Sequence, residues 1–92
     1  MEWRLFANLA EAAGTKRVTV EAGPGDTFGD AFEQLLKAHP ELEAEVLDES
    51  GELHDHIRVL RNDHDPFVVD EGFETELEAE DELAIFPPVS GG

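Results

Sequence analysis

Short stretches with strand-forming composition occur at four places along the chain, and they predict the β-strands of the fold. These stretches cover residues 2–6, 17–21, 57–61 and 82–86. In the first, Trp3 and Leu5 fall on one face, and Arg4 and Phe6 fall on the other. The connection between the first two stretches is too short for a long crossover, so we expect these two strands to be antiparallel neighbours.

One amphipathic helix is predicted between the second and third strands. Its apolar positions recur at helical spacing, which predicts a core-facing stripe of Phe28, Ala31, Phe32, Leu35 and Leu36. Thr27 is placed to cap the N-terminus, and Asp30 adds negative charge near the helix start. The helix should end near His39, because Pro40 disfavours helical geometry at the preceding residue.

Less regular segments are assigned from composition and turn residues. We expect a helical turn over 9–13 that stops at Gly14, and a second short helix over 41–47. Residues 67–69 are expected to form a short edge strand or a packed loop, and Leu77 should open a turn.

Together these elements predict an α+β fold: a mixed sheet of four to five strands with one main helix packed on one face. If the first and last strands pair centrally, only the residues after Phe86 project from the domain. We therefore expect a folded domain over 1–86 and a flexible tail over 87–92.

The charge balance excludes several classes of partner. The chain has 6 Lys and Arg against 23 Asp and Glu, a formal net charge of −17. Nucleic acid and anionic membranes are therefore poor partners, because both require positive charge on the protein. Forty per cent of the residues are hydrophobic and periodic, which favours a folded domain over an acidic disordered segment. Such a surface suits a very salty cytoplasm, where the Debye length falls to about 3 Å, and predicts loosened packing at low salt.

The absence of cysteine removes disulfides, thiolate metal sites and a cysteine nucleophile. The N-terminus carries no signal-peptide pattern, and no apolar run approaches the length of a membrane span. We expect a cytoplasmic protein.

The C-terminal residues carry the most specific chemical signal. Pro87-Pro88 ends the last strand and stiffens the start of the tail, which continues through Val89 and Ser90 to Gly91-Gly92. A Gly-Gly end is thin and conformationally free, so it can thread a narrow channel and present the Gly92 carboxylate to a reagent. The alternative is a frayed C-terminus that has no function.

The chain resembles the MoaD/ThiS group of ubiquitin-like β-grasp proteins, and within it the small archaeal modifier proteins of haloarchaea. The residues that carry the resemblance are Trp3-Arg4-Leu5-Phe6-Ala7, Leu9-Ala10-Glu11, Leu35, His39-Pro40, Ile57-Arg58-Val59-Leu60-Arg61-Asn62 and the block from Asp81 to Gly92. The chain departs from the family pattern where Glu80 and Asp63 replace frequent glycines, and where 64–76 is longer or more divergent.

The resemblance implies a modifier or carrier rather than an enzyme. A ubiquitin-activating-like enzyme would use ATP to adenylate Gly92, and no cofactor would be bound permanently. Attack by a target-protein lysine would give an isopeptide bond, which a deconjugating protease could remove. Attack by a sulfur donor would give a thiocarboxylate, as in the small subunit of molybdopterin synthase, whose large subunit would then be a partner. A third hypothesis is a non-covalent interaction domain in which the Gly-Gly is incidental.

Other candidate sites follow from individual residues. Val59, Ile85 and Phe86 could form a docking patch for the activating enzyme, although core positions are the alternative. Lys16 and Lys37 could accept a second copy of the chain, although the preferred interpretation is that they are solvated surface lysines.

A metal site is considered only at the histidines. His54-Asp55-His56 could begin a zinc site with His64 or Asp65, but in so acidic a chain a polar segment explains it as well. We predict no metal and no catalytic residues.

Overall fold

A computed structural model of the chain describes residues 1–54 and 57–87. The elements are, in order, β1 (Glu2–Leu5), α1 (Ala7–Ala13), β2 (Arg17–Thr19), α2 (Phe28–Ala38), the 3₁₀ turn η1 (Pro40–Leu42), α3 (Glu43–Val46), β3 (Arg58–Arg61), α4 (Pro66–Val69), the 3₁₀ turn η2 (Gly72–Glu74) and β4 (Glu82–Phe86). The four predicted strands are therefore present, each within a residue or two of its predicted bounds.

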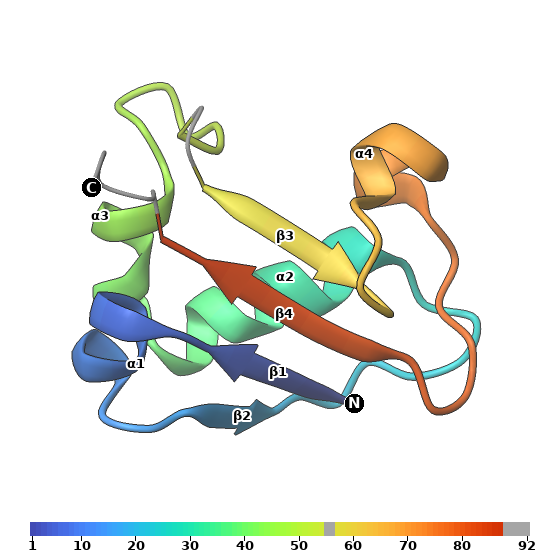
Figure 1. The fold of residues 1–92 in the computed structure, drawn as a ribbon, viewed down its shortest axis with the longest axis horizontal. Helices are drawn as coiled ribbons and strands as arrows, with labels where there is room; N and C mark the ends of the chain where they lie inside the picture. Colours follow the sequence, from blue (N-terminus) through green and yellow to red (C-terminus); the bar gives the residue numbers. More distant parts are fainter. Residues whose placement is uncertain (55–56, 88–92) are drawn as a thin grey trace.

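The sheet is mixed, and its strand order is β2-β1-β4-β3. β1 pairs antiparallel with β2 and parallel with β4, and β3 pairs antiparallel with β4. Figure 1 shows β1 and β4 side by side at the centre of the sheet. The first and last strands of the chain are therefore the two central strands, which confirms the expected central pairing and the expected α+β fold with a mixed sheet.

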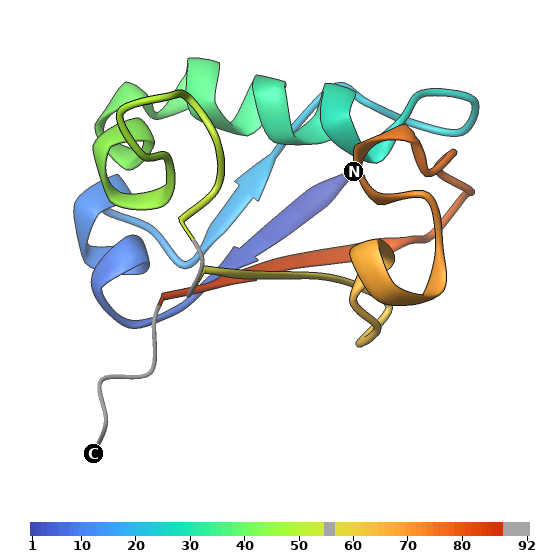
Figure 2. The ribbon, with the colours of Figure 1, turned by 90° about the horizontal axis from the view of Figure 1, so that it is seen from above.

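Helix α2 covers one face of this sheet (Figure 2). Thr27 and Asp30 form a capping box: the Thr27 hydroxyl accepts from the Asp30 N–H at 3.1 Å, and the Asp30 carboxylate accepts from the Thr27 N–H at 3.0 Å. Trp3 of β1 is fully buried beneath the helix, and its indole N–H donates to the Ala31 carbonyl at 3.0 Å. The predicted apolar stripe of α2 is confirmed, since Phe28, Ala31, Phe32 and Leu35 are buried and Leu36 is partly buried.

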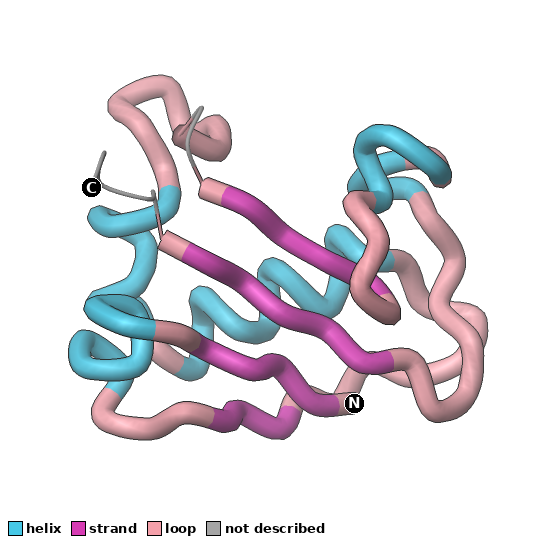
Figure 3. Tube along the Cα trace, viewed as in Figure 1, coloured by secondary structure: helices cyan, strands magenta, loops and turns pink. Residues whose placement is uncertain are grey.

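Residues 66–69 form the short helix α4, and the predicted edge strand or loop at 67–69 is therefore wrong (Figure 3). The Asp65 carboxylate caps this helix by accepting from the Phe67 N–H at 2.8 Å, and Pro66 occupies the first turn. Proline at a helix start needs no N–H partner, so this Asp-Pro pair favours a helix despite the β-branched valines that follow.

A buried carboxylate fixes the start of β4. Asp81 accepts hydrogen bonds from the Arg61 Nε, the Asn62 side-chain amide and the Glu78 N–H, each at 2.8 Å. Burial alone raises the pKa of the Asp81 carboxyl, but these donors together outweigh it and hold the pKa below its usual value. This network ties β3 to the turn that precedes β4.

Both departures from the family's glycine pattern fall where the backbone is left-handed. Asp63 and Glu80 each have φ of 68°. Glycine adopts this conformation without steric cost, whereas a residue with a Cβ does so at a cost of about 1 kcal/mol or more. The glycines expected at these two positions therefore correspond to a backbone requirement of the two turns.

Candidate functional site

The site is built around the end of β4. This strand ends at Phe86, as predicted, and Pro87 is the last residue described at this end of the chain. Because β4 lies between β1 and β3, the chain leaves the sheet at the end of a central strand. The predicted tail residues Pro88, Val89, Ser90, Gly91 and Gly92 lie outside the described residues.

Two aromatic rings adjoin this exit point. Phe6 follows β1, Phe86 ends β4, and their rings stack with centroids 4.4 Å apart and planes 12° apart. Phe6 remains 38% exposed. Because Trp3 and Leu5 face α2, strand alternation places Phe6 and Arg4 on the opposite face of the sheet. The rings therefore form an apolar platform on the sheet face that α2 does not cover.

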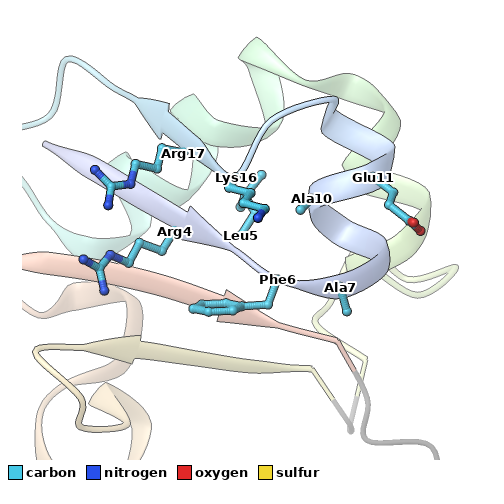
Figure 4. A pocket seen from close by; sticks show the side chains of 8 residues that line it. All are labelled: Arg4, Leu5, Phe6, Ala7, Ala10, Glu11, Lys16 and Arg17. Atoms are coloured by element: carbon cyan, nitrogen blue, oxygen red, sulfur yellow. The ribbon is translucent and has the colours of Figure 1, made fainter.

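Arginines extend this platform across the sheet. Arg4 lies directly opposite Arg17 in the β1–β2 ladder, and Arg58 lies opposite Phe86 in the β3–β4 ladder. Figure 4 shows the Arg4 and Arg17 side chains running side by side, with the Phe6 ring beyond them. Like charges directly across a ladder are destabilising, so stability does not explain this pairing.

Few carboxylates neutralise these arginines, even though acids outnumber bases almost fourfold in the chain. In the part of the chain that the structure describes, no carboxylate lies within 4.0 Å of the Arg4 guanidinium. Arg17 meets Glu2 only at 3.9 Å, and Arg58 meets Asp65 only at 4.0 Å. These are exposed pairs that contribute little.

A groove runs beside Arg4 and Phe6, between the sheet and α1. It has a volume of about 620 Å³, and its lining includes Arg17, Lys16 and Ala10 (Figure 4). With Arg58, four of the six basic residues of the chain thus lie on or beside this face, close to where β4 ends. We call Arg4, Phe6, Arg17, Arg58 and Phe86 the tail-side face.

The predicted docking patch requires correction. Val59 and Ile85 are 2% and 0% exposed, because their side chains point into the core beneath α2. They cannot contact a partner in the folded protein. Phe86 is only partly buried and does belong to the tail-side face. Sequence reasoning missed Phe6, although its alternation with Leu5 had already placed it on the face opposite the core.

Lys16 and Lys37 are both exposed, so their amines are accessible. Lys16 lines the groove of the tail-side face, and Lys37 lies in the last turn of α2. Their role as acceptors of a second copy stays a prediction.

The histidine segment is described only in part, since Asp55 and His56 lie outside the described residues. Across 1–54 and 57–87, no group of three or more His, Cys, Asp or Glu side chains is arranged to hold a metal ion.

None of the helices in these ranges combines the length and apolar character that crossing a membrane requires.

Comparison with known proteins identifies relatives over the whole chain. The model of the ThiS family matches residues 3–92. Small archaeal modifier protein 1 of Haloferax volcanii is 50% identical over 92 residues, which cover 100% of both chains. The crystal structure of SAMP1 from Haloferax volcanii gives a TM-score of 0.87 at 50% identity and covers 100% of this chain and 98% of that chain. A chain of the BexX/CysO complex from Amycolatopsis orientalis gives a TM-score of 0.79 at 27% identity, with 99% and 98% covered.

Proposed function

Because the chain belongs to the ThiS family of ubiquitin-like β-grasp proteins, we propose that it is a protein modifier attached to target lysines through Gly92. The single observation that carries this proposal is that the family match runs to residue 92, whereas the sheet ends at Phe86. Six residues therefore follow a central strand, and they lie within the stretch over which the chain matches Small archaeal modifier protein 1.

The chemistry begins with the Gly92 carboxylate, which is a poor electrophile. Its oxygen attacks the α-phosphate of ATP on an activating enzyme, and pyrophosphate leaves. The lysine Nζ of a target then attacks the carbonyl carbon of the acyl-adenylate, AMP leaves, and the nitrogen loses a proton. The product is an isopeptide bond. In this proposal the chain is a substrate, and catalysis belongs to the activating enzyme.

The tail-side face supplies the docking surface for that enzyme. The Phe6–Phe86 platform offers an apolar contact beside the start of the tail, and Arg4, Arg17 and Arg58 surround it with positive charge. We therefore expect the activating enzyme to present an apolar patch bordered by carboxylates. Such charge complementarity would orient a partner on a protein that is otherwise strongly acidic.

A second candidate function is sulfur transfer, in which a sulfur donor attacks the adenylate and leaves a Gly92 thiocarboxylate. The likeness to a chain of the BexX/CysO complex and the match to the ThiS family favour it. The chain has no cysteine, so the terminal carbonyl is where sulfur would be carried. The large subunit of a molybdopterin synthase would then be one partner. The two functions share the activation step and are compatible.

Mass spectrometry of the N-terminally tagged protein, purified from its host under denaturing conditions, tests both functions. Arg61 is the last basic residue, so trypsin would leave all of 62–92 on a target lysine. Cleavage after glutamate instead leaves residues 83–92, a short remnant with the native tail. A Ser90→Arg variant would give a Gly-Gly remnant with trypsin as an independent check.

Three outcomes separate the hypotheses. Remnants on lysines of other proteins, absent when Gly91 and Gly92 are deleted, would establish protein modification. Free protein whose Gly92 carries sulfur in place of one oxygen would establish the carrier role. Neither product, in a strain where the protein is activated normally by ATP, would leave a non-covalent interaction domain as the best hypothesis.

A further inference from the structure

A second apolar surface lies at the other end of the molecule, on α4 and η2. The described residues include five exposed large hydrophobic side chains, and four of them fall within residues 67–73. Val68 is 77% exposed, Val69 58%, Phe67 47% and Phe73 37%. We call these four residues the α4–η2 patch. Such clustering is unusual for a surface as acidic as this one, and clustered exposed apolar residues mark interaction sites.

The two aromatic residues of the patch are packed against each other and against the core. The Phe67 and Phe73 rings meet edge to face with centroids 4.9 Å apart, and Phe73 contacts the core ring of Phe32 at 5.3 Å. Gly72 has φ of 63°, and a Cβ there would lie 2.9 Å from the Phe67 ring. Gly29 of α2 similarly makes room for Phe73, whose carbonyl oxygen a Cβ at position 29 would approach to 3.1 Å. A surface fixed in this way loses little conformational entropy when it binds.

Two hollows adjoin the patch and define its chemistry. A largely apolar groove of about 480 Å³ lies beside α2; its large apolar side chains are Phe32, Leu36, Leu47, Leu53 and Phe73, and its charged ones are Asp30 and Glu33. A smaller hollow of about 310 Å³ is acidic. Its charged lining consists of Arg61, Asp70, Glu71, Glu74, Glu76 and Glu78.

Arg61, the basic residue that lines the acidic hollow, already forms ion pairs with three carboxylates. The Arg61 guanidinium contacts Asp81 at 2.8 Å, Asp70 at 3.4 Å and Glu78 at 3.7 Å. The remaining carboxylates leave the hollow strongly negative beside an apolar surface. A second copy of the chain that docked symmetrically would bring the same carboxylates directly against these, where salt screens repulsion least, and this disfavours it as the occupant.

We propose that the α4–η2 patch is a docking surface for a partner protein segment that carries large apolar side chains next to Arg or Lys. The apolar side chains rest on Phe67, Val68 and Phe73, and a basic side chain enters the acidic hollow. At high salt, long-range attraction is screened, so the apolar contact supplies most of the affinity and the basic side chain supplies specificity.

The position of the patch determines whether it can bind a partner while the chain is joined to a target. Arg61, the last residue of β3, lies opposite Leu83 near the start of β4, so α4 follows β3 at the end of the sheet away from Phe86. Figure 1 shows α4 and the end of β4 at opposite sides of the molecule. The patch therefore faces away from the point where the chain would be joined to a target, and it stays accessible in a conjugate.

Selection from a displayed library of random 12-residue peptides tests the proposal, using the full chain in molar KCl. Affinities of the enriched peptides are then measured by fluorescence anisotropy for the wild type and two variants. Val68→Asp places a charge in the patch at a highly exposed position, and Ala44→Asp adds the same charge on exposed α3. We expect enriched peptides to combine aromatic or aliphatic residues with Arg or Lys, and Val68→Asp to weaken binding at least about tenfold while Ala44→Asp does not.

Deleting Gly91 and Gly92 should leave this binding unchanged, so failure of the proposed conjugation and failure of the docking surface are distinguishable. The proposal is overturned if no peptides are enriched, if the enriched peptides lack basic residues, or if Val68→Asp binds them as well as the wild type does. Analytical ultracentrifugation tests for self-association. A concentration-dependent dimer that Val68→Asp abolishes would identify a second copy as the occupant and would also overturn the proposal.

Discussion

The ring of Phe6 stacks on the ring of Phe86, and this contact joins the ends of the two central strands where the chain leaves the sheet. One ring comes from the N-terminal part of the chain and the other from the C-terminal part. The parallel pairing of β1 with β4 is what brings them together.

Replacing Phe6 with alanine should impair activation more than folding. The ring is partly exposed, so its loss removes a docking contact and only part of a packing contact. We expect kcat/KM for ATP–pyrophosphate exchange by the activating enzyme to fall at least about tenfold. Phe67→Ala is the matched control, since it removes a similarly exposed ring at the other end of the sheet. Equal effects of the two changes would contradict the assignment of the tail-side face.

Charge reversal at Arg4 should slow activation but raise the free energy of unfolding. Arg4→Glu removes a positive charge from the tail-side face, but it also replaces a like-charged pair with Arg17 by an opposite-charged one. We expect slower activation together with a gain of about 0.2–1 kcal/mol in the free energy of unfolding. Lys37→Glu, an equal reversal at the exposed end of α2, should leave activation unchanged. A parallel loss of stability and activity would argue for a purely structural role of Arg4.

Glu80→Gly should stabilise the protein, because φ at this position is 68°. Relief of the left-handed strain outweighs the added flexibility of the unfolded chain, and we expect a gain of about 0.5–1 kcal/mol. Thermal unfolding should show this as a rise in Tm of a few degrees. Two controls separate the causes. Glu80→Ala removes the charge but keeps the Cβ and should not reproduce the gain, and Ala79→Gly loosens the same turn and should be destabilising.

Asp81→Asn should destabilise the protein by about 2–3 kcal/mol near neutral pH, because a buried charge-assisted hydrogen bond to Arg61 is lost. The folded state lowers the pKa of the Asp81 carboxyl, so this carboxyl contributes stability above its unfolded pKa, and that contribution is lost as pH falls through the folded value. The stability gap between wild type and variant should therefore shrink in acid. Chemical unfolding from pH 7 to pH 3 measures it, with exposed Glu49→Gln as the control for loss of one charge. A gap that stays constant across this range would show that the carboxylate itself contributes nothing.

The sequence by itself determined most of the elements whose signal is local, with α4 as the exception. Thr27 and Asp30 fixed the start of α2, and the alternation from Trp3 to Phe6 fixed which side of β1 faces the core, because caps and strand periodicity depend only on near neighbours. The family resemblance likewise rested on contiguous residues, above all the block that ends at Gly92.

Only the tertiary structure decided which residues share a surface. Val59 and Ile85 have the apolar character of a docking patch, but sheet pairing turns both toward α2, and burial there excludes them. Arg17, Arg4 and Arg58 are far apart in the chain, and their common face depends on strand order and register. The α4–η2 patch was missed for a different reason: Val68 and Val69 favour a strand by composition, but the neighbouring Asp65 cap and Pro66 favour a helix that projects them outward.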